Sequence, residues 1–259
     1  MDIIAFEVLG AEVKGYLQAD YETLVAHKQR PALVICPGGA YRWRSPREKD
    51  PPALEFLAMG YQVFILEYAC GEQAADYRPL RQLAETVRRL RENHAAWHID
   101  PDKIAVLGFS AGGHLAASLG ALWSDPALEL PKEARPDALI LCYPVISTRE
   151  FAHEESAMWV SGGDEAMRDR LHLLERVTPD FPPTFLWHGG GDTSVPPENS
   201  LLLAVRLKQN GVPLEYHLFE TGLHGISTCT QEVETPDEVC RAWLPLCKTW
   251  LNRRFQYTP

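Results

Sequence analysis

The stretch Gly108-Phe109-Ser110-Ala111-Gly112 decides how this 259-residue chain is expected to fold. It has the form G-x-S-x-G, follows an apolar run at 104–107 and precedes a segment of helical character at 114–122. A strand, a sharp turn and a helix in this order expose the central serine at the end of the strand. The two glycines let the turn close because they bring no side chain into it. The sequence therefore predicts a turn that presents Ser110; a surface turn that happens to contain serine is the alternative.

Apolar runs and helical patterns alternate along the rest of the chain. Strands are expected at residues 3–8, 12–18, 31–36, 62–68, 138–143, 185–187 and 214–219, with the first two paired antiparallel. Helices are expected at residues 53–59, 76–97 and 198–210, and from 235 onward with a kink at Pro245. This order predicts an α/β fold, a mostly parallel twisted sheet covered by helices on both faces.

Local signals are expected to set the ends of several elements. Ser45 with Glu48, and Thr235 with Glu238, have the spacing of a capping box at the start of a helix. Asp100-Pro101-Asp102 is expected to break the chain just before the strand that leads to Ser110.

Residues 145–180 do not fit the alternation. They contain one expected helix at 165–176 and Trp159. Ligands bind outside the carboxyl ends of the strands in open α/β sheets, so this segment is expected to be a short cap-like insertion beside a pocket. A plain surface excursion is the alternative. The whole chain, 1–259, is expected to form a single domain.

Composition excludes several classes of protein. A net charge of −10 argues against a nucleic-acid partner, and the basic cluster of Arg88, Arg89 and Arg91 is interpreted as a solvated helix face. No apolar stretch is long enough to span a membrane, and the N-terminal residues lack the pattern of a secretory signal. A homo-oligomer is left open.

Six cysteines occur without C-x-x-C spacing. Cys36 and Cys142 fall in apolar strand-like runs and are expected to be buried thiols. This usage favours a reducing, cytoplasmic location.

A serine hydroxyl needs a base and a third group that orients the base before it can act as a nucleophile. In this kind of fold the order along the chain is serine, acid, histidine. Asp192 and His224 each follow an expected strand and fit this order, while Asp180 and Glu220 are fallback acids. Ser110, Asp192 and His224 are therefore predicted to be catalytic; a turn-capping Asp192 and a solvent-exposed His224 are the alternatives.

An oxyanion formed on the substrate needs N–H donors fixed in advance. The N–H of Ala111 is one expected donor, and the second is expected from Gly39 or Ala40 in the glycine-rich loop after the strand at 31–36. Tyr41, Trp43 and Trp159 are candidate substrate-binding residues, and His114 is expected to be structural. No metal-ligand spacing and no nucleotide-binding fingerprint is found, so neither a metal nor a cofactor is expected.

The chain resembles the α/β-hydrolase superfamily, and within it the small bacterial esterases related to acetylxylan and feruloyl esterases, near the hormone-sensitive-lipase-like group. The motifs that carry the resemblance are Pro37-Gly38-Gly39-Ala40-Tyr41, Gly108-Phe109-Ser110-Ala111-Gly112-Gly113-His114-Leu115, Arg135-Pro136-Asp137, Tyr143-Pro144-Val145, Pro182-Pro183-Thr184-Phe185, Asp192-Thr193-Ser194-Val195-Pro196 and His224-Gly225. Cys36-Pro37 stands where lipase-like relatives have histidine before the glycines.

The resemblance implies a serine carboxylesterase that uses Ser110, Asp192 and His224 on small acyl esters, with acetylated xylo-oligosaccharides as the leading substrate class. The same machinery cleaves amides in kynurenine-formamidase-like relatives, which is the second hypothesis. A non-catalytic binding protein that kept the fold is the third.

Overall fold

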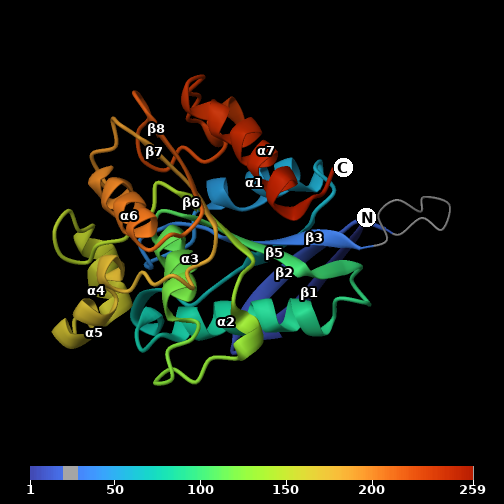
Figure 1. Cartoon of the computed structure of the whole chain (residues 1–259), viewed down its shortest axis with the longest axis horizontal. Coiled ribbons are helices and arrows are strands. Elements are labelled where there is room, and N and C mark those ends of the chain that lie inside the picture. The colour runs from blue at the N-terminus through green and yellow to red at the C-terminus, as the bar shows by residue number, and fades with distance from the viewer. Residues whose placement is uncertain (20–28, 259) are drawn as a thin grey trace.

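Eight strands form one sheet in the computed structural model, which describes residues 1–19 and 29–258 (Figure 1). The order across the sheet is β1-β2-β4-β3-β5-β6-β7-β8. The pairs β1/β2 and β2/β4 are antiparallel, and all other neighbours are parallel. The strands are β1 Asp2–Val8, β2 Ala11–Leu17, β3 Arg30–Cys36, β4 Gln62–Leu66, β5 Ile99–Phe109, β6 Ala138–Cys142, β7 Thr184–Gly189 and β8 Leu214–Phe219.

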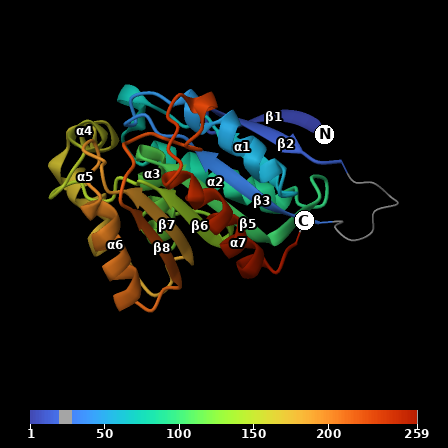
Figure 2. The same ribbon diagram turned by 90° about the horizontal axis from the view of Figure 1, so that it is seen from above.

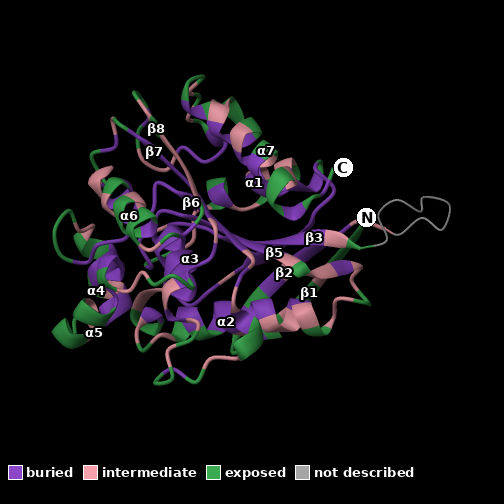
Figure 3. Cartoon of the chain, viewed as in Figure 1, coloured by how far each residue is buried: buried purple, intermediate pink, exposed green. Residues whose placement is uncertain are grey.

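Helices cover both faces of the sheet, as the sequence predicts (Figures 1 and 2). The helices are α1 Asp50–Leu57, α2 Arg78–Glu92, α3 Ala111–Leu122, α4 Glu154–Ser161, α5 Glu165–Arg170, α6 Glu198–Gln209 and α7 Trp243–Phe255. Helices α2, α3 and α6 pack on one face, and α1 and α7 pack on the other. Each face of the sheet carries a hydrophobic core. Side chains along β3 alternate between the two cores, with Val34 in the core under α2, α3 and α6 and Ile35 in the core under α1 and α7. Strands β6 and β7 are therefore buried along their whole length, and β3 is buried after its first residue, Arg30 (Figure 3).

The expected strands are confirmed, with one correction before Ser110. Strand β5 begins at Ile99, so Asp100-Pro101-Asp102 lies within it rather than ahead of it. The pairing with β3 jumps from Arg30–Ile99 to Ala32–Ile104, so these three residues form an irregularity in the ladder.

Both predicted capping boxes are wrong. Ser45 makes no side-chain cap, and Glu48 turns inward to hydrogen-bond other segments. Helix α7 begins at Trp243 rather than near Thr235, whose hydroxyl donates to the carbonyl of Ile226. Pro245 thus lies in the first turn of α7, where its missing N–H leaves no hydrogen bond unmade and no kink is required.

The segment 145–180 contains two helices, α4 and α5, where the sequence predicted one longer helix at 165–176. Figures 1 and 2 place both at the end of the molecule opposite the two chain termini. The carboxyl end of α4 is closed by Gly162, whose φ of +64° suits a residue without Cβ.

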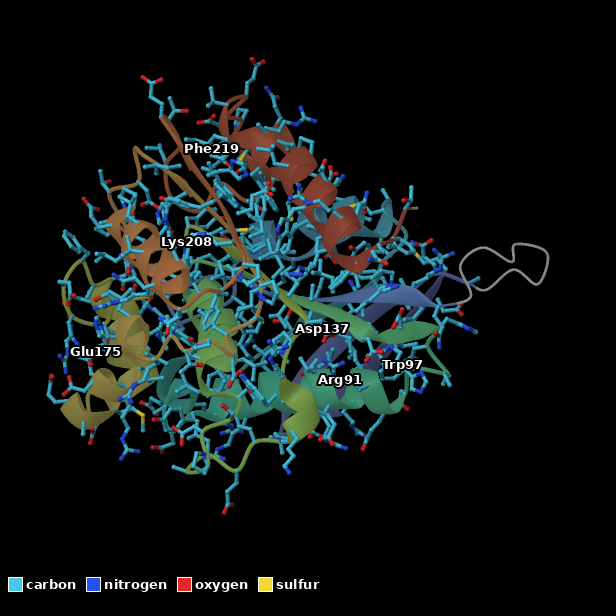
Figure 4. All side chains as sticks on the ribbon, in the orientation of Figure 1. Arg91, Trp97, Asp137, Glu175, Lys208 and Phe219 are labelled. Atoms are coloured by element: carbon cyan, nitrogen blue, oxygen red, sulfur yellow. The ribbon has the colours of Figure 1, made fainter. Side chains whose placement is uncertain are left out.

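The interpretation of Arg91 as a solvated residue is wrong. Its guanidinium donates to the carboxylate of Asp137, 3.1 Å away, and to the carbonyl oxygens of Pro101, Glu133 and Arg135 (Figure 4). The same carboxylate accepts from the N–H of Ile104 at 2.8 Å. Arg91 therefore ties α2 to the amino-terminal ends of the neighbouring strands β5 and β6.

Candidate active site

Ser110 lies in a strained turn between β5 and α3. Its backbone has φ +52° and ψ −118°, values that a residue with a side chain rarely adopts. A Cβ on Gly108 would come within 2.1 Å of the carbonyl oxygen of Gly112, and one on Gly112 within 2.0 Å of the carbonyl oxygen of Cys36. The backbone therefore leaves no room for a side chain at either position, as the sequence predicts.

The three residues predicted to be catalytic meet at the carboxyl edge of the sheet. The hydroxyl oxygen of Ser110 is 2.7 Å from Nε2 of His224, and Nδ1 of His224 is 2.6 Å from Oδ2 of Asp192. An ionised carboxylate only accepts, so Nδ1 carries the proton and the neutral ring accepts from the serine hydroxyl at Nε2. Neither fallback acid, Asp180 or Glu220, occupies the position beside His224.

Asp192 is held by four donors. Its Oδ1 accepts from the N–H groups of Ser194 and Val195, and its Oδ2 accepts from His224 and from Nε2 of His188. Burial alone would raise the pKa of this carboxyl, but the hydrogen bonds from the two histidines and from the Val195 N–H outweigh it and lower the pKa below the usual range. Asp192 therefore stays ionised wherever His224 can act as a base.

His188 was not singled out from the sequence. It is fully buried at the end of β7, and its Nδ1 is 2.7 Å from the hydroxyl of Ser200. Since the Ser200 hydroxyl can donate to Nδ1, Nε2 carries the proton, which is shared between Oδ2 of Asp192 at 3.2 Å and the carbonyl oxygen of Val195 at 3.0 Å. The sequence feature that could have identified His188 is its position at the end of a predicted strand, four residues before Asp192.

The loop after β3 lies against Ser110. A Cβ on Gly38 would be 2.9 Å from Cβ of Ser110, so the two segments touch at this glycine. Among the described residues, the N–H groups of Gly39 and Ala40 have no acceptor, and Ala111 as the first residue of α3 has no intrahelical acceptor for its N–H. The N–H of Ala111, and those of Gly39 and Ala40 as the alternatives for the second donor, thus have no competing acceptor among the described residues.

A cavity of ≈ 810 Å³ opens above Ser110 and His224. Gly39 and Ala40 line it together with Trp43, which is 54% exposed, and the insertion contributes His153 and Glu155. Acidic side chains surround its opening: Asp50, Glu155, Glu232 and Glu234.

Two of the three candidate substrate-binding residues lie elsewhere. Tyr41 is buried and its hydroxyl is 2.9 Å from Nδ1 of His114, so the expectation that it lines the pocket is wrong. Trp159 packs against the core on the α2/α3 face and does not line the cavity, which corrects its assignment too. Of the three candidates, Trp43 is the one that lines the cavity.

His114 is structural, as expected. Its Nε2 donates to the carbonyl of Leu171, 3.0 Å away, and Nδ1 accepts from Tyr41. Burial lowers the pKa of His114 to about 4, so the ring is neutral.

Because His114 is buried in its neutral form, we expect the folded protein to lose stability in acid. Its pKa lies below the ordinary 6.5, so the unfolded chain binds the extra proton first and stability is lost as pH falls from 6.5 to about 4. We expect His114→Gln to abolish this loss, about 3 kcal/mol across that window. Unfolding midpoints in urea between pH 4 and 7 check it, and equal slopes for both proteins would contradict it.

Some chemistry is absent from the described residues. No group of three or more His, Cys, Asp or Glu side chains within 1–19 and 29–258 could hold a metal ion. In the same ranges no helix is long and apolar enough to cross a membrane. Cys36 and Cys142 are buried free thiols, as predicted.

Comparison with known proteins places this arrangement in a family. The BD-FAE family profile matches residues 21–207. An acetylxylan esterase of Xylanibacter ruminicola is 26% identical over 204 residues, which cover 75% of this chain and 40% of that protein. The chain spans between 34% and 52% of the length of the curated relatives it matches.

Solved structures match over nearly the whole chain. An acetyl ester-xyloside bifunctional hydrolase from Caldicellulosiruptor lactoaceticus superposes with a TM-score of 0.84 at 34% identity, covering 98% of this chain and 91% of that one. The carboxylesterase Cest-2923 from Lactobacillus plantarum gives a TM-score of 0.87 at 27% identity, with 100% of both chains covered. Fold and sequence therefore define an α/β hydrolase. Within this class, the chain belongs to the BD-FAE family.

Proposed function

We propose that the protein is a serine carboxylesterase that acts through an acyl-enzyme. The hydroxyl of Ser110 attacks the ester carbon, while His224 takes its proton and passes it to the leaving alcohol. Asp192 holds the imidazole and stabilises its charged form. Water then attacks the acyl-enzyme with the same histidine as base, which releases the acid and restores Ser110. The observation that carries the proposal is the continuous hydrogen-bonded chain from Ser110 through His224 to Asp192.

The oxygen of the tetrahedral intermediate would be bound by the N–H groups of Ala111 and of Gly39 or Ala40. These groups lie on the two segments that meet beside Ser110. Donors fixed before the reaction stabilise the charge as it develops and need no reorganisation at that moment.

We further propose that the natural substrates are acetylated, hydroxyl-rich alcohols such as xylo-oligosaccharides. Several carboxylates and the exposed indole of Trp43 line the cavity. Together they suit a hydroxyl-rich sugar ring, whose hydroxyls can donate hydrogen bonds to the carboxylates and whose face can stack on the indole. Two relatives support the same class, since one is named an acetylxylan esterase and the other an acetyl ester-xyloside hydrolase.

Turnover of a graded substrate set tests this proposal. Among p-nitrophenyl esters, we expect kcat/KM to be highest for the acetate and to fall as the acyl chain lengthens. We also expect the protein to release acetate from acetylated xylo-oligosaccharide with a similar kcat/KM. N-formylkynurenine is the comparison substrate. Faster cleavage of this amide than of any ester would replace the esterase proposal with an amidase. Absence of all turnover, together with failure of a fluorophosphonate probe to label Ser110, would indicate a binding protein.

A further inference from the structure

Glu48 is a buried carboxylate beside the reacting groups that the proposed mechanism does not use. Its side chain is only 2% exposed and lines the floor of the cavity. Burial raises the pKa of this carboxyl, against hydrogen bonds from Tyr143 and Gly38 that lower it. A buried carboxylate without hydrogen-bond partners is strongly disfavoured, so its partners are the first place to look for its role.

One oxygen of Glu48 holds the loop that follows β3. Oε2 accepts from the N–H of Gly38 at 2.8 Å. This bond occupies the Gly38 N–H, while the next two N–H groups, of Gly39 and Ala40, have no protein acceptor among the described residues, and both residues line the cavity. The carboxylate therefore anchors the loop that carries the expected oxyanion donors.

The other oxygen holds the loop that carries the histidine. Oε1 accepts from the hydroxyl of Tyr143 at 2.7 Å, and the Tyr143 oxygen accepts from the N–H of Ser227 at 2.9 Å. Ser227 lies three residues beyond His224, and the Tyr143 ring packs edge-on against the imidazole, with 5.1 Å between ring centroids. The carboxylate thus reaches the His224 loop through a single side chain.

We propose that Glu48 is a positioning residue that sets the oxyanion loop and the His224 loop against Ser110 at the same time. This inference rests on the esterase function proposed above. The groups that Glu48 orders act on the charge that develops in the transition state, so its loss should lower kcat and leave the KM of a small ester nearly unchanged.

Glu48→Ala tests the proposal, with Glu48→Gln as the matched variant. The alanine variant leaves the Gly38 N–H without its acceptor, and we expect kcat for p-nitrophenyl acetate to fall by about 10²–10³, the loss typical of one missing oxyanion donor. A glutamine oxygen can still accept from Gly38 while its amide nitrogen donates to the Tyr143 oxygen, so Glu48→Gln should restore kcat to within about tenfold of the unmodified protein.

Inhibition by phenylboronic acid is the second measurement. The inhibition constant of this compound would not change if Glu48 only stabilised the fold. Its boron accepts the Ser110 oxygen, the serine proton passes to His224, and a tetrahedral anion forms with an oxygen directed at the Gly39 and Ala40 N–H groups. We expect Glu48→Ala to weaken inhibition by about the same factor as kcat, and Glu48→Gln to restore it.

The outcomes separate this inference from the proposed function. A protein that hydrolyses no ester before any substitution contradicts the proposed function. A protein that hydrolyses esters, but whose Glu48→Ala variant keeps both kcat and boronate affinity, overturns the role of Glu48 alone. If the alanine variant does not fold, Glu48→Gln decides: a kcat reduced less than about tenfold at unchanged KM supports the role, and a raised KM at unchanged kcat overturns it.

Discussion

Replacing Ser110 with alanine is expected to reduce kcat for p-nitrophenyl acetate by about 10⁶, to the residual rate that the cavity and the N–H donors still support. The variant keeps the cavity and the N–H donors, but no atom remains that could form the acyl-enzyme. His224 loses the hydroxyl that lies 2.7 Å from its Nε2, and nothing else in the described structure bonds to that nitrogen. Acetate released at fixed times measures the loss of turnover, and a fluorophosphonate probe measures the loss of covalent labelling.

Ser118→Ala is the matched control for that result. Ser118 lies two turns further along α3, is also buried, and its hydroxyl donates to the carbonyl of His114. We expect this variant to be labelled and to retain kcat, although it loses about 1 kcal/mol of stability. Full turnover by Ser110→Ala would show that another group is the nucleophile and would remove the proposed mechanism.

The second large effect is expected for Asp192→Asn, about 10⁴ in kcat. The asparagine N–H group cannot accept from Nδ1 of His224, so the imidazole takes the other tautomer and its Nε2–H faces the Ser110 hydroxyl. His188 also loses its bond to Oδ2 of Asp192, but its Nε2 keeps the carbonyl oxygen of Val195, 3.0 Å away, as an acceptor. The KM for p-nitrophenyl acetate should change little, since binding of the ester does not depend on the tautomer.

Asp180→Asn and Glu220→Gln are the controls for this prediction. Both remove a carboxylate near the ends of β7 and β8, and neither residue bonds to His224. We expect both variants to keep kcat within about twofold. If either control lost most of its kcat while Asp192→Asn kept normal turnover, that other acid would be the residue that orients His224.

Much of the reactive arrangement could be predicted because its determinants are local. The turn at Ser110 needs small residues at 108 and 112 whatever the rest of the chain does, as the 2.0 Å and 2.1 Å approaches of their absent Cβ atoms to backbone oxygens explain. Asp192 and His224 follow the neighbouring strands β7 and β8, and parallel strands bring their carboxyl ends to one edge. Apolar runs, turns and order along the chain were sufficient to place all three residues there.

The errors share a physical cause, which is that long-range partners outcompeted local motifs. Glu48 has the spacing to cap its own helix, yet it bonds to Gly38 and Tyr143. Thr235 donates its hydroxyl hydrogen to the carbonyl of Ile226 instead of capping a helix at 235. A sequence window of four residues cannot distinguish these outcomes, because the competing partners lie nine or more residues away.

Tyr41 and Trp159 were misplaced for a related reason. Aromatic rings near a catalytic loop serve equally well as pocket wall or as core, and only packing separates the two. Tyr41 turns toward His114 and Tyr68 on the buried side of its loop, whereas Trp43, two residues later, faces outward.

The segment between β6 and β7 lines the cavity but contributes no atom to the proposed reaction. It supplies His153 and Glu155 to the cavity wall, while every atom assigned to bond making comes from loops anchored in the sheet. A differently shaped segment inserted at the same point would present a new wall to an unchanged nucleophile. Diversification of substrate range by exchange of this one stretch is therefore compatible with a constant reaction.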